Sequence, residues 1–78
     1  MKISEPLLLY LRADCHLCEQ VIVMLEGADV RWRPVDIDGD LMLTKKYGLR
    51  IPVLRLPDSG RELDYPFDEE RLRLFLGL

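Results

Sequence analysis

The sequence predicts an α/β fold with the element order β-α-β-α-β-β-α, in which a four-stranded mixed sheet has helices on both faces. Three observations predict this fold. An apolar run ends just before a Cys-x-x-Cys motif, an amphipathic pattern begins at that motif, and a Pro-Asp-Ser-Gly turn joins two later runs. A strand, a helix and a strand joined by short connections form a βαβ unit, whose strands are parallel and whose crossover is right-handed.

The first strand is expected over residues 7–12, where Leu7-Leu8-Leu9-Tyr10-Leu11 is continuously apolar. Pro6 and the polar turn Ala13-Asp14 bound this run. Continuous apolarity is typical of a central strand whose two faces are both covered. Leucine suits a helix equally well, so the prediction of a strand depends on the short length of the run and on its flanks.

The first helix is expected over residues 15–26. Its apolar residues fall at positions i, i+4, i+7 and i+8, which places them on one packed face; they are Leu17, Val21, Met24 and Leu25. Gly27 is the expected C-terminal end of this helix. Asp14 or Cys15 is the expected N-cap.

A second strand is expected over residues 30–37, and Pro34 places it at an edge of the sheet because proline cannot donate a ladder hydrogen bond. The acidic turn over residues 36–40 lacks the twelve-residue ligand pattern of a calcium loop. We expect Asp38 or Asp40 to cap a short helix over residues 41–47, which Gly48 closes.

The last third of the chain predicts a hairpin and a helix. Strands are expected over residues 50–56 and 61–65, antiparallel to each other and joined by the turn at 57–60. Asp68 is the expected N-cap of the final helix, whose packed stripe consists of Leu72, Phe75 and Leu76.

Composition bounds the class of protein. The 78 residues predict one domain, 1–78, and 49% hydrophobic with 32% charged residues is typical of a soluble globular chain. A net charge of -3 and scattered basic residues argue against a nucleic-acid partner. The sequence has neither an apolar run of membrane-spanning length nor a signal-peptide pattern at its start, so we expect a cytoplasmic protein without a membrane partner.

Cys15 and Cys18 lie where the first strand ends and the first helix begins. Unpaired N–H groups and the helix dipole stabilise a thiolate at that position and lower the pKa of the thiol. Two other interpretations stay open. A zinc site requires four ligands, and beyond the two cysteines the chain offers only His16 and carboxylates, so no metal site is predicted. The cysteines can also be an inert core pair.

The chain resembles glutaredoxin, a member of the thioredoxin superfamily, from Leu7 to Leu76. It is most similar to a group of short bacterial glutaredoxin-like proteins with Cys-His-Leu-Cys. Three matches carry this resemblance: Cys15-His16-Leu17-Cys18 after the first strand, Ile51-Pro52 at the start of the third, and the basic Arg12 three residues before Cys15. The resemblance implies a thioredoxin-like fold in its short glutaredoxin form.

The resemblance also implies roles for these residues. Cys15 would attack a disulfide and Cys18 would resolve the mixed disulfide. A cis peptide bond at Pro52 would shape the groove, and the Ile51 backbone would pair with an extended peptide or with glutathione. Arg12 would support the thiolate. From its chemistry alone, a protonated His16 would add positive charge near Cys15, whereas a neutral His16 is only an exposed loop side chain. We expect a monomer without a bound cofactor, whose partners are a disulfide-containing protein or glutathione as co-substrate.

Two positions depart from the glutaredoxin pattern. The Gly-Gly turn after the fourth strand, which helps to bind glutathione, is replaced by Asp64-Tyr65-Pro66-Phe67-Asp68. Asp14 stands where many relatives have glycine, and its carboxylate opposes thiolate formation at Cys15. Two alternatives to an oxidoreductase therefore stay open. One is a thioredoxin-fold interaction module without turnover, and the other is an iron–sulfur carrier in which Cys15 from two subunits and two glutathiones hold a cluster.

Overall fold

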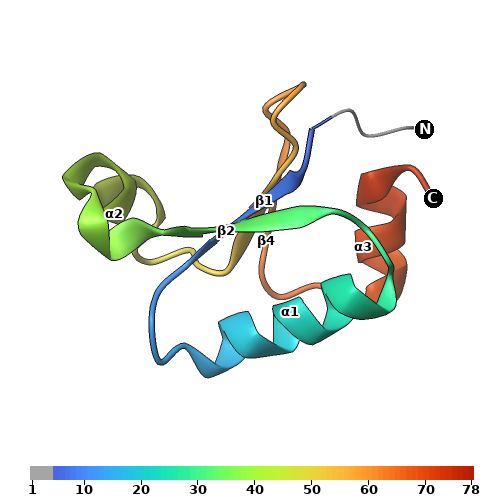
Figure 1. Ribbon diagram of the computed structural model, residues 1–78, viewed down its shortest axis with the longest axis horizontal. Helices are drawn as coiled ribbons and strands as arrows, with labels where there is room; N and C mark the ends of the chain where they lie inside the picture. Colours follow the sequence, from blue (N-terminus) through green and yellow to red (C-terminus); the bar gives the residue numbers. More distant parts are fainter. Residues whose placement is uncertain (1–4) are drawn as a thin grey trace.

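The computed structural model describes residues 5–78 and contains a four-stranded sheet in the order β2-β1-β3-β4 (Figure 1). The elements along the chain are β1 (Leu7–Leu11), α1 (His16–Gly27), β2 (Trp32–Asp36), the 3-10 helix η1 (Ile37–Gly39), α2 (Leu41–Tyr47), β3 (Val53–Arg55), β4 (Glu62–Asp64) and α3 (Glu69–Leu76). This order confirms the predicted α/β fold class.

The sheet is mixed, as predicted. β1 pairs parallel with β2 and antiparallel with β3, so that Tyr10 faces Val35 on one side and Val53 on the other. β3 pairs antiparallel with β4, with Leu54 opposite Leu63. β1 and β3 are therefore central strands, and β2, which contains the proline, is an edge strand as expected.

Helices cover both faces of the sheet, but unequally. α1 and α3 cover the face with the larger core, formed by Leu7, Leu9, Val21, Leu25, Leu54, Leu63, Leu72, Phe75 and Leu76. The seven-residue α2 covers the other face, where the buried residues are Tyr10, Ile37, Tyr47 and Val53. In Figure 1, α2 (yellow-green) stands apart from α1 (cyan) and α3 (red).

The structure corrects two details of the first helix. Leu17 is 42% exposed, whereas Cys18 is 2% exposed and takes its place on the packed face. The buried stripe therefore follows the spacing i, i+3, i+7 from Cys18, because Leu17 lies about 100° away around a 3.6-residue turn. Gly27 belongs to the helix, and the chain leaves it through Ala28 and the left-handed Asp29 (φ 57°).

The capping predictions are largely confirmed. Asp40 caps α2, where its carboxylate accepts the N–H of Met42 at 2.9 Å, and Asp68 caps α3. The Asp36 side chain caps η1. Gly48 closes α2 as predicted, because a Cβ atom at this position would lie 2.5 Å from the Thr44 carbonyl oxygen.

Two proline peptide bonds are cis. The Ile51–Pro52 bond is cis, as the resemblance implied, and so is the Tyr65–Pro66 bond, which the sequence analysis did not predict. Over residues 5–78, none of the helices has the length and apolar character needed to cross a membrane.

Candidate functional site

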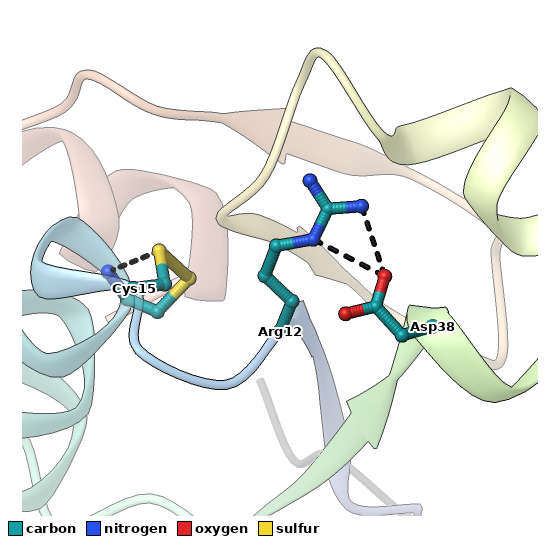
Figure 2. The surroundings of a disulfide bond; sticks show 4 residues. Arg12, Cys15 and Asp38 are labelled. Carbon is teal, nitrogen blue, oxygen red and sulfur yellow. Dashed lines mark hydrogen bonds and ion pairs between the residues drawn. A yellow bond between two sulfur atoms is a disulfide. The ribbon is translucent and has the colours of Figure 1, made fainter.

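Cys15 and Cys18 form a disulfide at the start of α1, with their Cα atoms 5.2 Å apart (Figure 2). Cys15 is the N-cap of the helix, and its backbone is extended. Its Sγ atom accepts the N–H of Cys18 at 3.2 Å. The sulfur therefore occupies the position in which a capping side chain normally satisfies an unpaired helix N–H, and a thiolate there meets the positive end of the helix dipole.

The two sulfur-bearing residues differ in exposure. Cys15 is half-buried, whereas Cys18 is buried. The two residues between them, His16 and Leu17, are both exposed. Cys15 is therefore the more accessible of the two residues from solvent, and Cys18 lies one helical turn further along, in the interior.

Arg12 lies in the chain between β1 and α1, and its guanidinium is turned toward Asp38 rather than toward the sulfurs (Figure 2). Its Nη2 and Nε atoms donate to Asp38 Oδ1 at 2.9 and 3.2 Å. The sequence analysis had Asp38 as a candidate helix cap and missed this pairing, which joins residues 26 positions apart. The positive charge expected to support Cys15 is thus shared with a carboxylate.

Asp14 adopts a left-handed backbone conformation, with φ of 58°. Glycine adopts this region without steric cost, and aspartate is one of the few other residues found there regularly. The Asp14 side chain is exposed directly before Cys15, so its charge is screened by water.

Ile51 and Pro52 lie at the same end of the sheet as the disulfide. Because Tyr10 pairs with Val53 in antiparallel register, the chain after β1 runs opposite the chain before β3. Pro52 is fully buried. The N–H of Ile51 donates to the Tyr47 carbonyl at 3.0 Å, so this donor is used inside the protein.

The segment after β4 contains two aromatic residues that contact neighbouring parts of the protein. The N–H of Tyr65 donates to the Pro52 carbonyl at 3.1 Å, and its hydroxyl lies 3.4 Å from Gln20 Oε1 on α1. The Phe67 ring packs edge-on against Tyr65, with centroids 5.8 Å apart. Asp68 accepts the N–H of Arg71 at 2.8 Å, so its carboxylate is occupied as a helix cap.

A polar network that the sequence analysis missed lies on the α2 side of the sheet. Glu62 on β4 accepts hydrogen bonds from Tyr47, Arg50 and Arg55. Partial burial by itself raises the pKa of Glu62, but these three donors outweigh it and lower the pKa to about 2. Burial and the hydrogen bond to Glu62 raise the pKa of Tyr47. The donors come from α2, from β3 and from the connection between them, and the acceptor lies on β4, so no local sequence pattern predicts these hydrogen bonds.

Across the described part of the chain, residues 5–78, the structure brings together no group of three or more His, Cys, Asp and Glu side chains suited to a metal ion. The chemistry that the described site offers is therefore that of its two sulfurs, a helix N-terminus and a short stretch of backbone beside Pro52.

Comparison with known proteins gives a family match over almost the whole chain. The model of the family described as Glutaredoxin-like domain (DUF836) matches residues 6–77. No functionally curated protein matches the chain.

Three solved structures are similar to this one. The X-ray structure of protein XcR50 from X. campestris is 51% identical, covers 91% of this chain and 95% of its own, and gives a TM-score of 0.85. The solution structure of protein Ne2328 from Nitrosomonas europaea is 32% identical, covers 96% of both chains, and gives a TM-score of 0.77. The thioredoxin-like protein BC3987 is 20% identical over 90% of this chain and 97% of its own, with a TM-score of 0.67, which shows a shared fold.

Proposed function

The chain belongs to the glutaredoxin-like domain family, and on that premise we propose that it is a thiol–disulfide oxidoreductase. One observation carries the proposal. Cys15 is the more accessible sulfur and caps α1, so its Sγ atom accepts a helix N–H that would stabilise the thiolate after reduction.

The proposed cycle transfers two electrons. The Cys15 thiolate attacks one sulfur of a substrate disulfide, forms a mixed disulfide and releases the other substrate sulfur as a thiolate. The Cys18 thiolate then attacks Sγ of Cys15, which forms the Cys15–Cys18 disulfide and releases the second substrate sulfur. The substrate is reduced to two thiols, and an external dithiol or two glutathione molecules return two electrons to the protein.

We propose a protein or peptide disulfide as the substrate, with glutathione as a possible co-substrate. An extended peptide would pair with the Ile51 carbonyl, while Pro52 would form the wall of the groove. Arg12, held by Asp38, would add positive charge near Cys15, and the exposed His16 directly follows Cys15 in the sequence. Tyr65 fills the space after β4, which favours a peptide over glutathione. The proposed setting is a monomer in the reducing cytoplasm.

The rate of Cys15 alkylation by iodoacetamide as a function of pH tests this proposal, with the Cys18→Ser variant used so that one thiol reports. We expect a midpoint below the value of about 8.5 that is typical of a free cysteine. The Cys15→Ser variant is the matched control, because its remaining Cys18 is buried and should react slowly. A midpoint at or above the free value would favour the interaction module that has the fold without turnover.

Turnover gives an independent test. With dithiothreitol as reductant and a peptide disulfide as substrate, Cys15→Ser should abolish exchange. Pre-reduced Cys18→Ser, mixed with the peptide disulfide after dithiothreitol has been removed, should accumulate a mixed disulfide visible by mass spectrometry. If Cys15→Ser retained full activity, the proposed roles of the two cysteines would be wrong.

A further inference from the structure

Tyr47 is the last residue of α2, and both its backbone and its side chain hold neighbouring parts of the protein. Its carbonyl accepts the N–H of Arg50 at 2.8 Å and that of Ile51 at 3.0 Å. Its ring stacks on Tyr10 of β1 with centroids 4.0 Å apart, and its hydroxyl donates to Glu62 of β4. The end of α2 therefore ties the chain that enters β3 to two strands of the sheet.

Arg50 makes a second connection from the same segment to β4. Its Nε and Nη2 atoms donate to the two carboxylate oxygens of Asp64 at 2.8 and 2.9 Å, and Nη2 also donates to Glu62 at 2.7 Å. Its Cζ atom lies 5.0 Å from the centroid of the Tyr47 ring. A guanidinium that is fixed by two parallel hydrogen bonds and an aromatic face has a defined orientation, which a single ion pair does not give.

We propose that Tyr47, Arg50, Glu62 and Asp64, here called the β4 clamp, are positioning residues that hold the Ile51 backbone in place for an extended peptide disulfide. This inference rests on the proposed oxidoreductase function. The clamp holds the backbone on one side of the Ile51 carbonyl, and Tyr65, the residue after β4, holds it on the other side. Tyr47 binds the Arg50 and Ile51 N–H groups, and the carbonyl of the following Pro52 accepts the N–H of Tyr65, which directly follows β4.

The clamp acts on backbone position and not on sulfur chemistry. Cys15 and Cys18 lie on α1, which packs on the opposite face of the sheet from Tyr47. A small disulfide without a peptide backbone has no group that can pair with Ile51, so its rate of reduction depends only on the reactivity of Cys15. The rate of reduction of a peptide disulfide depends both on that reactivity and on the position of the Ile51 carbonyl. Comparing the two substrates therefore isolates the clamp.

The test is steady-state reduction of a peptide disulfide and of bis(2-hydroxyethyl) disulfide, with dithiothreitol as reductant. For Arg50→Gln we expect KM for the peptide to rise about fivefold, as for loss of a partly exposed bidentate ion pair. We expect its kcat and the kcat/KM for the small disulfide to be unchanged. Arg50→Lys should recover part of the effect, because an ammonium group keeps the charge and loses the fork.

Two further variants separate the clamp from general destabilisation. Asp64→Asn changes the exposed partner and should raise the peptide KM in the same way, and the double variant with Arg50→Gln should be no worse than either single variant. Arg55→Gln is the matched control. It also removes a cation from Glu62, at 3.2 Å, but Arg55 is the last residue of β3, at the end farthest from Ile51, so the peptide KM should stay at the wild-type value.

The outcomes are distinguishable. If Arg50→Gln lowered kcat/KM equally for both substrates, or changed it for neither, the proposed clamp would be wrong. The proposed oxidoreductase function would still stand, because the wild-type protein would be active. A wild-type protein that reduces neither disulfide would overturn the proposed function, and the clamp with it. A peptide-specific rise in KM for Arg50→Gln and Asp64→Asn, with Arg55→Gln unaffected, would establish the clamp.

Discussion

The two faces of the sheet are built from different interactions. The α1/α3 face buries nine apolar residues in one continuous cluster. The α2 face buries four, two of which are the stacked tyrosines Tyr10 and Tyr47. Around those tyrosines lies a network of two arginines and two carboxylates, of which Arg50 and Glu62 form the centre.

The two faces of the sheet therefore serve different purposes: one mainly stabilises the fold, and the other mainly fixes the positions of side chains and backbone. Burial of apolar surface is non-directional and scales with area, so the α1/α3 face supplies most of the free energy of folding. Hydrogen bonds contribute less net free energy but fix direction. Over residues 5–78 every buried side-chain nitrogen and oxygen has a partner, so the polar network of the α2 face is complete. Arg50, next to Ile51 in the sequence, belongs to that network through Glu62 and Asp64.

Truncation of the larger core should have the largest effect. Leu25 on α1 is fully buried within the nine-residue cluster. We expect Leu25→Ala to lower the free energy of unfolding by about 2–5 kcal/mol, because the substitution loses buried area and leaves a cavity. Urea unfolding followed by circular dichroism measures this as a lower midpoint at an unchanged slope. Val23→Ala, on the exposed side of the same helix, is the control and should change the midpoint little.

If Leu25→Ala cost less than a polar substitution on the α2 face, the proposed division between the two faces would be wrong. In a domain of this size the expected loss is a large part of the total stability, so the variant is best measured at low temperature in the presence of a stabilising osmolyte.

Protonation of Glu62 at low pH should cause the next largest loss in the free energy of unfolding, and this residue lies on the α2 face. The folded-state pKa of Glu62 is about 2, below its ordinary value of 4.5. A carboxyl group with a depressed pKa stabilises the fold fully above its unfolded-state pKa, and this contribution is lost as the pH falls toward the folded-state value. We therefore expect wild type to lose at most about 3 kcal/mol between about pH 4.5 and pH 2 through this residue.

Comparison with Glu62→Gln checks this expectation. The amide keeps the shape of the side chain but does not titrate, so the variant should be less stable than wild type at pH 6 and should approach it near pH 2. Urea midpoints at intervals of pH measure the difference between the two curves. Parallel curves would show that the α2 network contributes no charge-dependent stability.

Removal of one hydroxyl should have a smaller effect. Tyr47→Phe keeps the stacking on Tyr10 and loses the hydrogen bond to Glu62. We expect a loss of about 1–2 kcal/mol in the free energy of unfolding, because the acceptor is charged and keeps its arginine partners. Tyr65→Phe is the matched control, since the Tyr65 hydroxyl lies 3.4 Å from its partner at an exposed position. Equal losses in both variants would show that the network adds nothing beyond an ordinary surface contact.

The sequence alone predicted the features that depend on local patterns. Strand order along the chain, the caps Asp40 and Asp68, and the edge position of β2 all follow from residues within a few positions of one another. The placement of Cys15 and Cys18 at a strand–helix junction followed in the same way.

Features that depend on residues distant in the sequence were not predictable. Arg12 pairs with Asp38 across 26 positions and Arg50 with Asp64 across 14, and both pairings require the sheet register to be known. The exposure of Leu17 was mispredicted because Leu17 and Cys18 are both apolar, and only the packing of α1 on the sheet decides which one faces inward.

The ion pair Arg12–Asp38 is more exposed to solvent than Glu62 in the α2 network. It lies at the same end of the sheet as the disulfide, and its side chains are 37% and 52% exposed, whereas Glu62 in the α2 network is 17% exposed. Water screens exposed ion pairs, so we expect Asp38→Asn to change the free energy of unfolding by less than about 1 kcal/mol. Urea unfolding at low and at 0.5 M salt measures it, and the difference between variant and wild type should shrink with salt. The contrary result would be that Asp38→Asn lowers the free energy of unfolding as much as Tyr47→Phe at both salt concentrations. That result would show that burial does not determine how much a polar contact contributes to stability, and the Arg12–Asp38 pair would then be equivalent to the contacts of the α2 network.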